Sequence, residues 1–296
     1  MNIDSKLTKH YLQKSSTHSK SGYTNKQVCS LMPAPLIKIS SLTKEFCSVK
    51  ALNDLNFWVM PGEIYGLLGP NGAGKTTTIK IITGLLKPTS GGVKVGGFDP
   101  VKNPIEVKSR IGYVAEKPIL YESLSPRDFL EFVASIRKMD QNLTNSVITQ
   151  LANAFDMTKY FDAPIATLSM GMKQKVSLIA ALIHQPPILL LDEPLNGLDA
   201  KSSRIIKDLL SLHIQKGGAV LFSTHIMEVA EHICTRIGII YEGKVIAEGN
   251  LDKLKNKISG RSETLEEVFL KLTNQEMEVA ETTRFLGETF FKNESN

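Results

Sequence analysis

The chain has 296 residues, of which 42% are hydrophobic, so it can form one large domain or one domain with appendages. No segment approaches the roughly 18–20 uninterrupted apolar residues that a membrane-spanning helix requires, and the N-terminus lacks an apolar signal segment. The three cysteines are odd in number and widely separated, which favours neither a disulfide framework nor a zinc site. We therefore expect a soluble chain from a reducing compartment.

The net charge of +5 is unevenly distributed along the chain. Residues 1–35 carry five lysines and one aspartate, which account for +4 of it, whereas the chain from Leu36 onward is nearly balanced. Since this larger part has no dense basic segment, a nucleic-acid partner is not expected.

The first 35 residues are rich in Ser, Thr, Lys, Asn and Gln and show no sustained periodicity, which predicts a disordered tail. Three interpretations remain open. The tail is a solvated extension, or it touches anionic lipid with about 1 kcal/mol per basic residue, or it lies upstream of a translation start at Met32. The third interpretation arises because the folded pattern begins only at Leu36.

Predicted strands and helices alternate along the rest of the chain. Apolar runs and alternating apolar residues predict strands at 36–39, 55–59, 63–68, 93–95, 111–115, 188–191, 219–222, 237–240 and 245–247. Two helical apolar stripes within 126–156 predict a helical insertion, and a short helix is expected at 265–272 before a polar tail. The alternation favours right-handed crossovers, and therefore an α/β fold with a mostly parallel sheet.

Residues 69–77 read GPNGAGKTT and match G-x-x-x-x-G-K-[ST], the phosphate-binding loop known as Walker A. The loop lies between the strand at 63–68 and a helical apolar pattern, so backbone N–H groups and a helix N-terminus point to one place. Lys75 is expected to reach the β- and γ-phosphates, and the Thr76 hydroxyl to bind Mg²⁺. The candidate nucleotide-binding residues of this loop are Gly69, Pro70, Asn71, Gly72, Ala73, Gly74, Lys75, Thr76 and Thr77.

Two acidic residues, Asp192 and Glu193, follow the apolar strand at 188–191. An aspartate at this strand end can hold Mg²⁺ opposite Thr76, and a glutamate directly after it can orient and polarise the attacking water. Standing alone, such a pair is also compatible with a solvated loop.

Residues 168–174 (LSMGMKQ) contain a second candidate anion site. Ser169 is a good N-cap residue, Gly171 allows a close backbone approach, and a helical pattern runs on to about Ile183. A second helix start of this kind predicts contact with another phosphate group.

At this point the sequence resembles the ATP-binding cassette (ABC) superfamily, whose signature segment is similar to L-S-G-G-Q. Leu168, Ser169, Gly171 and Gln174 match this pattern, while Met170 and Met172 replace the small residues that flank Gly171. The loop at 69–77, this segment, ILLLDEP at 188–194, NGLD at 196–199 and His225 after a strand occur in the family's order. The resemblance covers roughly residues 36–248.

The resemblance implies a P-loop NTPase cassette with a mostly parallel sheet core, an antiparallel β subdomain and an inserted α-helical subdomain at about 117–167. The cassette would occupy residues 36–249, followed by a C-terminal helical extension and tail at 250–296. Two cassettes would pair head to tail, so that one completes the nucleotide site of the other. The residues implied at that seam are Ser169, Gly171, Gln174 and Asp199.

The resemblance also implies roles for single residues. Glu193 looks like the catalytic base, and His225 is similar to the switch histidine that contacts the γ-phosphate, although alone it would be read as a core or surface histidine. Phe46, 29 residues before Lys75, falls where the family stacks an aromatic ring on adenine; without the family it would equally be read as a core residue. Glu116 stands where the family usually has Gln. The expected Mg²⁺ ligands are Thr76, Asp192 and Glu116.

We therefore expect the ATP-binding and ATP-hydrolysing subunit of an ABC transporter, with ATP and Mg²⁺ as cofactors. It would work with a separate transmembrane permease, docked near 117–122 and the helical lobe on the cytoplasmic face of the membrane. Glu116 and LEEVFLKL at 265–272 resemble exporter-type subunits, which indicates export. A soluble ABC-type clamp on ribosome or DNA is the alternative, and a P-loop kinase or GTPase would leave residues 168–174 without a role.

Overall fold

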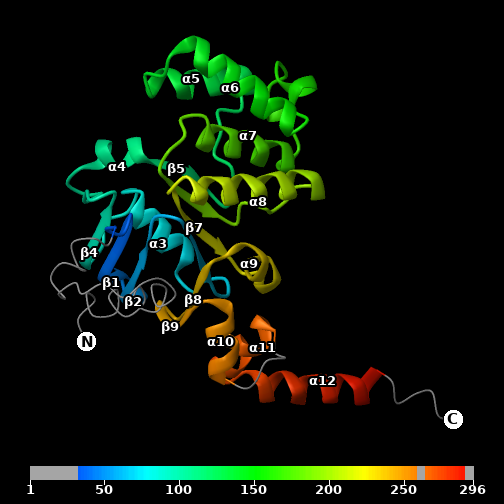
Figure 1. Cartoon of the computed structure of the whole chain (residues 1–296). Coiled ribbons are helices and arrows are strands. Elements are labelled where there is room, and N and C mark those ends of the chain that lie inside the picture. The colour runs from blue at the N-terminus through cyan, green and yellow to red at the C-terminus, as the bar shows by residue number, and fades with distance from the viewer. Residues whose placement is uncertain (1–32, 259–263, 291–296) are drawn as a thin grey trace, which may run out of the picture. The chain divides into compact units, whose positions relative to one another are not determined.

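The computed structural model describes residues 33–258 and 264–290 (Figure 1). Its strands are β1 (Ile37–Phe46), β2 (Val49–Val59), β3 (Glu63–Leu68), β4 (Ser90–Val95), β5 (Ile111–Val114), β6 (Ile188–Asp192), β7 (Ala219–Thr224), β8 (Arg236–Tyr241) and β9 (Lys244–Gly249). Its α-helices are α3 (Lys75–Ile82), α4 (Pro104–Arg110), α5 (Pro126–Ile136), α6 (Gln141–Ala154), α7 (Met170–Leu182), α8 (Ala200–Gln215), α9 (Met227–Ile233), α10 (Leu251–Ile258), α11 (Leu265–Leu272) and α12 (Glu276–Phe290). The expected tail at 1–32, including the alternative start at Met32, lies outside the described residues.

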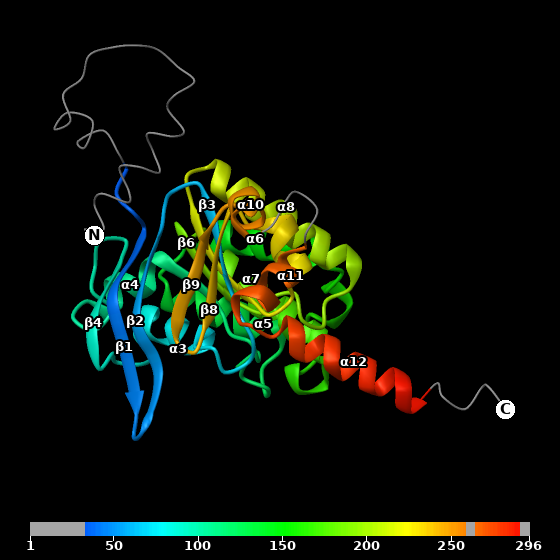
Figure 2. The same ribbon diagram turned by 90° about the horizontal axis from the view of Figure 1, so that it is seen from below.

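β3, which leads into the glycine-rich loop, lies inside a six-stranded sheet with the order β5-β6-β7-β3-β8-β9 (Figures 1 and 2). All neighbouring strands are parallel except β8 and β9, which form an antiparallel pair. Every residue of β3, β6 and β7 is buried, as is typical of strands that are covered on both faces. The prediction of a mostly parallel sheet is confirmed.

Alternate residues of the central strands belong to different cores, because successive side chains of a strand point to opposite faces. Leu189 and Leu191 of β6 pack with buried side chains of α7 and α8. Ile188 and Leu190 pack with α3 and with the antiparallel strands. The sheet is therefore fixed from both sides, which sets the position of the strand ends where the site lies.

A second sheet contains three antiparallel strands in the order β2-β1-β4. β1 and β2 are longer than the strands expected at 36–39 and 55–59, because register irregularities let their pairing continue to Phe46 and Val49. Phe57 of this sheet stacks on Tyr65 of β3, with ring centroids 4.8 Å apart, and so joins the two sheets. The expected antiparallel β subdomain is present.

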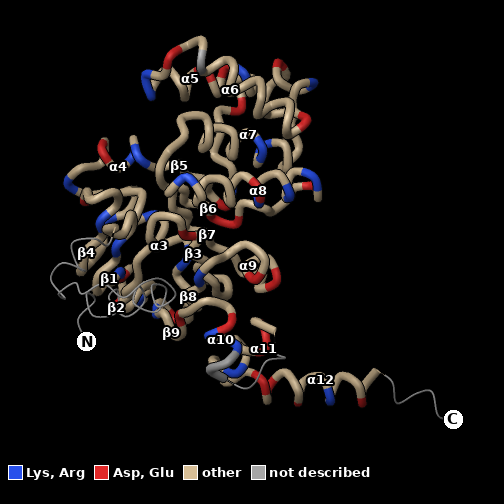
Figure 3. Tube along the Cα trace, viewed as in Figure 1, with Lys and Arg blue, Asp and Glu red and all other residues tan. Residues whose placement is uncertain are grey.

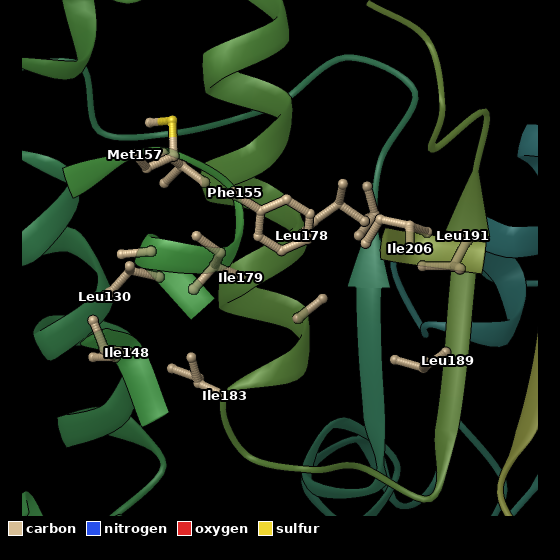
Figure 4. Close-up of a cluster of buried hydrophobic side chains, with 14 of the residues drawn as sticks. Leu130, Ile148, Phe155, Met157, Leu178, Ile179, Ile183, Leu189, Leu191 and Ile206 are labelled. Atoms are coloured by element: carbon tan, nitrogen blue, oxygen red, sulfur yellow. The ribbon is translucent and has the colours of Figure 1, made fainter. Parts of the chain in front are cut away.

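The chain between β5 and β6 contains α5, α6 and α7, and α5 and α6 form a lobe beyond the sheet (Figure 1). α5 begins with a capping box, in which Ser125 Oγ accepts a hydrogen bond from the N–H of Asp128 and the Asp128 carboxylate accepts one from the N–H of Ser125. Leu130, Ile148 and Ile179, one from each helix, belong to one buried cluster (Figure 4). This is the inserted α-helical subdomain; its bounds at 117–167 stay a prediction.

The C-terminal part packs against β8 through α10 and α11. Leu254, Leu265 and Val268 are buried in one cluster with side chains of β8. α11 covers the residues expected to be helical, whereas the expected polar tail contains a further helix, α12, which buries none of its residues. Basic and acidic residues are interspersed along the described elements (Figure 3). Within these elements, no helix is both long and apolar enough to cross a membrane.

Candidate functional site

A pocket of about 240 Å³ opens where α3 begins and β6 ends. Its lining residues are Asn71, Gly72, Gly74, Lys75, Thr76, Thr77, Glu116, Asp192 and Glu193. They come from three segments of the chain: the loop after β3 with the start of α3, the segment after β5, and the end of β6 with the residue that follows it. Because the carboxyl ends of parallel strands meet at one edge of the sheet, the fold brings these segments together. The three expected Mg²⁺ ligands and the expected base thus line one pocket.

The loop between β3 and α3 requires glycine at two positions. Gly74, the residue before α3, has a φ of +110°, a conformation in which a side chain would be strained. Gly69 lies so close to β8 that an added Cβ would be 2.1 Å from the carbonyl oxygen of Ile240. No side chain caps the start of α3, so its N-terminal N–H groups are available to an anion.

Lys75 is nearly fully buried, and its ammonium group lies within the loop. Its Nζ donates hydrogen bonds to the carbonyl oxygens of Gly69 at 2.7 Å and Pro70 at 3.1 Å, and it lies 3.9 Å from Oε1 of Glu193. Burial lowers the pKa of Lys75, and nearby carboxylates, Glu193 foremost, oppose that shift. The ammonium group of Lys75 is therefore held beside Glu193, at the end of β6.

Asp192, at the end of β6, connects Thr76 of the glycine-rich motif to Ser223 of β7. Its Oδ2 accepts a hydrogen bond from Thr76 Oγ1 at 2.8 Å, and its Oδ1 accepts one from Ser223 Oγ. Asp192 and Ser223 face each other in the β6–β7 pairing. Sequence reasoning missed Ser223, because its segment reads only as a buried strand; the register of the two strands is the signal that reveals it.

Glu193 has a φ of +49°, in the left-handed region that non-glycine residues rarely adopt. Its Oε1 accepts a hydrogen bond from the backbone N–H of His225 at 2.8 Å and lies 2.7 Å from His225 Nδ1. Its Oε2 accepts a hydrogen bond from Thr224 Oγ1 at 3.0 Å. A strained, fully bonded acid at a pocket is typical of a functional position. Thr224, like Ser223, was not foreseen from the sequence.

Two predicted residues lie at the margin of this site. Glu116 lines the pocket and is exposed. Phe46 is 44% exposed at the end of β1, with Lys44 Nζ 4.8 Å from its ring centroid, and it does not line the pocket. Tyr113 is a further neighbour of these acids. Burial, followed by the negative charges of Asp192 and Glu116, raises the pKa of Tyr113 to about 12.

The predicted second helix start forms at Ser169, outside this pocket. Ser169 Oγ caps α7 by accepting a hydrogen bond from the N–H of Met172 at 3.3 Å, and Met170 beside it is 61% exposed. An added Cβ on Gly171 would lie 2.2 Å from the carbonyl oxygen of Gly197, so only glycine fits there. Neither Ser169 nor Gly171 lines the pocket of its own chain.

The structure corrects the placement of Gln174 and refines that of Asp199. Gln174 is 1% exposed and its Nε2 donates to the carbonyl oxygen of Pro194 at 3.2 Å, so its side chain is buried within its own chain and not presented at the surface. Gln174 lies one helical turn after Met170 on the same face of α7, and it is buried where the segment after β6 passes at Pro194. Asp199 accepts hydrogen bonds on both oxygens within the chain, from the N–H of Ser202 and from Lys175 Nζ.

A glycine-rich loop between a buried parallel strand and a helix, with an aspartate at the end of another strand of the same sheet bonded to the threonine of the motif, defines a P-loop nucleoside triphosphatase. A family model described as ABC transporter matches residues 52–196. The solved structure of an ATP-binding subunit of an ABC transporter superposes with a TM-score of 0.77 at 32% identity, covering 80% of this chain and 99% of that one.

Curated relatives agree with this assignment. The ABC transporter ATP-binding protein NatA of Bacillus subtilis (strain 168) is 38% identical over 223 residues, which cover 75% of this chain and 90% of NatA. The chain is also 38% identical to the probable multidrug ABC transporter ATP-binding protein YbhF of Escherichia coli (strain K12), but it spans only 41% of YbhF's length, with 80% of this chain covered. The chain belongs to the ABC transporter family and is an ATP-binding, ATP-hydrolysing cassette.

Proposed function

We propose that this cassette hydrolyses ATP to drive export through a separate transmembrane permease. The observation that carries the proposal is that one chain presents two candidate phosphate-binding elements that do not meet: the pocket at α3 and β6, and the capped helix start at Ser169. The names of two relatives support export. YbhF is a probable multidrug ABC transporter ATP-binding protein, and BcrA of Bacillus licheniformis is a bacitracin transport ATP-binding protein. BcrA is 38% identical to this chain over 75% of this chain's length and 72% of BcrA's length.

Two cassettes would close on each other so that the start of α7 of one completes the pocket of the other. The N-terminus of a helix attracts anions through its free N–H groups and its dipole, and Ser169 and Gly171 lie there. The similar cassette MJ0796 is dimeric in two solved structures, one of them bound to ADP and Pi. The present chain is 26% identical to the first of these, with ADP and Pi, and 27% identical to the second. Each match covers 73% of this chain and 98% of the MJ0796 chain, with a TM-score of 0.65. Asp199, with a side chain 55% exposed, would lie near the seam.

Within each pocket, the loop N–H groups and Lys75 would bind the ATP phosphates. The Thr76 hydroxyl and the carboxylates of Asp192 and Glu116 are hard oxygen donors, the kind that fits Mg²⁺ when phosphate oxygens and water complete its coordination. Bound there, Mg²⁺ would neutralise charge on the phosphates.

Glu193 would act as the general base. Its carboxylate would take a proton from the water whose oxygen forms a bond to the γ-phosphorus, while the bond from that phosphorus to the leaving oxygen of ADP breaks. His225 and Thr224 hold the carboxylate in place, which favours this role because a base must be oriented toward the water. His225 would also contact the γ-phosphate.

The helical lobe offers a surface on which a permease would dock. Ile119, Tyr121 and Phe132 are 88%, 60% and 44% exposed, and the rings of Tyr121 and Phe132 meet edge to face at 5.7 Å. A group of exposed apolar side chains is typical of a protein contact. This group begins three residues after Glu116, which lines the pocket, so the permease would sense the nucleotide there. Docking would hold the cassette on the cytoplasmic face of the membrane.

Replacing Phe46 with alanine is expected to raise the KM for ATP about 5- to 150-fold with little change in kcat, because a base stacked on an aromatic ring gains about 1–3 kcal/mol. Steady-state hydrolysis assays measure both constants. Val49→Ala is the matched control, since Val49 pairs with Phe46 in the same hairpin and is 65% exposed. An unchanged KM in the Phe46 variant would remove this residue from the nucleotide site.

The proposed function is tested by isolating the Glu193→Gln variant with its partners from native membranes in ATP and Mg²⁺, and identifying them by mass spectrometry. We expect a polytopic membrane protein without a cassette of its own, enriched over a sample prepared without nucleotide. Recovery of ribosomal or other soluble partners alone, with the cassette absent from membranes, would overturn the export proposal in favour of a soluble clamp.

A further inference from the structure

A buried lysine of α7, Lys175, connects three parts of the molecule. Its Nζ donates hydrogen bonds to Asp199 Oδ2 at 2.6 Å and to the carbonyl oxygen of Phe155 at 3.2 Å, and the residue is only 9% exposed. Phe155 follows α6 of the helical lobe, whereas Asp199 caps α8 on the sheet domain. One ammonium group therefore joins the lobe, the first turns of α7 and the start of α8.

The loop at 194–199 is tied to α7 at two further points. Gln174 donates a hydrogen bond to the carbonyl oxygen of Pro194, and Gly171 lies against the carbonyl oxygen of Gly197 with no room for a side chain between them. Pro194 directly follows Glu193 in the chain. The segment that begins at the proposed base is thus fastened along its length to the helix that starts at Ser169.

A second ion pair nearby shows that Lys175 is unusual. Lys201 of α8 binds Asp156, next to Phe155, at the same N–O distance of 2.6 Å, but both of these side chains are more than half exposed. Exposed pairs contribute little to stability, whereas a buried ammonium group loses hydration and requires partners on its donors. The ammonium group of Lys175 is thus held by two fixed partners at a buried junction, unlike that of Lys201, which points to a role in geometry.

We propose that Lys175 is a positioning residue for ATP hydrolysis: it fixes the loop at 194–199 to α7 and to the end of α6, so that the placement of Glu193 follows the placement of the lobe and of the start of α7. This inference rests on the proposed function. It links Glu193, the proposed base, to two other parts of the chain: the surface where the permease would dock, and the helix that would face the partner's nucleotide. Lys175 does not line the pocket, and neither do its hydrogen-bond partners Phe155 and Asp199.

The test compares kcat with nucleotide affinity in the purified full-length protein. Lys175→Met is expected to lower kcat about 10-fold or more, since a displacement of about 1 Å at a catalytic group can cost about 100-fold. The dissociation constant of a fluorescent ATP analogue, measured without Mg²⁺ so that no hydrolysis occurs, is expected to stay within about twofold because the residues that line the pocket are intact. Lys201→Met is the matched control and should change neither quantity.

Conservative variants identify the bond that matters. Lys175→Arg should recover most of kcat, because a guanidinium group can donate to both Phe155 and Asp199. Asp199→Asn keeps a capping side chain for α8 but weakens the bond to Lys175, so it should lower kcat as well. If the two residues act through one bond, the double variant Lys175→Met/Asp199→Asn should be no slower than the slower single variant.

Three results would overturn the proposal. The first is wild-type kcat in Lys175→Met, and the second is a loss of nucleotide affinity as large as the loss of kcat. The third is a pair of losses that multiply in the double variant, because Asp199 would then act independently of Lys175 at the seam. Should Lys175→Met fail to fold, Asp199→Asn alone carries the test, and wild-type kcat in it overturns the proposal. The wild-type hydrolysis rate and the membrane partners test the proposed function separately, so each idea can fail without the other.

Discussion

Replacing Glu193 with glutamine is expected to lower the kcat of ATP hydrolysis about 100- to 10,000-fold, the range over which general bases act. Glutamine matches glutamate in size and can still accept the hydrogen bond from the backbone N–H of His225, so the pocket should keep its shape. ATP affinity should therefore change little. Phosphate release measures the rate, and size-exclusion chromatography with ATP and Mg²⁺ should show the variant accumulating as a dimer, because bound ATP is no longer consumed.

Glu242→Gln is the control for this variant. Glu242 is also an acid with a positive φ, +47°, but it lies at the β8–β9 turn and does not line the pocket, so its substitution should leave kcat unchanged. A Glu193 variant that retains more than about half of the wild-type rate would place the base elsewhere. His225→Ala would then be the next variant, since the His225 side chain lies within hydrogen-bond distance of the same carboxylate.

Replacing Arg236 with methionine is expected to lower the free energy of unfolding by about 3–5 kcal/mol, the usual effect of removing one partner of a buried ion pair. The Arg236 guanidinium bonds both oxygens of the buried Glu63 and one oxygen of Glu248, and it lies 5.0 Å and 4.7 Å from the rings of Trp58 and Tyr65. Burial alone would lower the pKa of Arg236, but the bonds and charges of these acids outweigh it and raise the pKa. Without the cation, the Glu63 carboxylate would be buried and unpaired.

Urea unfolding measures this effect. Variant and wild type are compared at the same ATP concentration, because bound nucleotide stabilises the folded state by an amount that depends on that concentration. Arg204→Met serves as the control: Arg204 forms an exposed pair with Asp208 on α8, and its loss should change stability by less than about 0.5 kcal/mol. Adding Glu63→Gln to the Arg236 variant should recover part of the loss, because the unpaired charge is removed. An Arg236 variant as stable as the control would show that the cluster contributes nothing net.

Features of the site that lie within one contiguous stretch could be predicted from the sequence. The glycine-rich loop shows its own strand, turn and helix start, and Asp192 follows a strand apolar enough to be buried, so the meeting of Thr76 and Asp192 follows from parallel topology alone. Ser223 and Thr224 could not be found in this way. Their role depends on how β6 and β7 align, and a one-residue slip between the strands would have turned other side chains toward the acids.

Contacts with segments distant in the sequence were the other feature that the sequence did not reveal. Motif position placed Gln174 among the residues that face a second nucleotide, but the segment that follows β6 lies against this residue and accepts its hydrogen bond at Pro194. α12 also escaped prediction: its polar and apolar residues are mixed, and none of them is buried. Where no core dictates a pattern, periodicity carries little information.

The position of β3 within the sheet has a consequence for the order in which the protein is made. Both strands that flank it, β7 and β8, come from residues 219–241, long after β3 itself has left the ribosome. The antiparallel strands β1, β2 and β4 can pair early, but the phosphate-binding loop has no finished framework until the last third of the chain is synthesised. A nascent chain therefore carries the apolar segment EIYGLL without its neighbouring strands until residues 219–241 have been made, which leaves an apolar strand open to aggregation during synthesis.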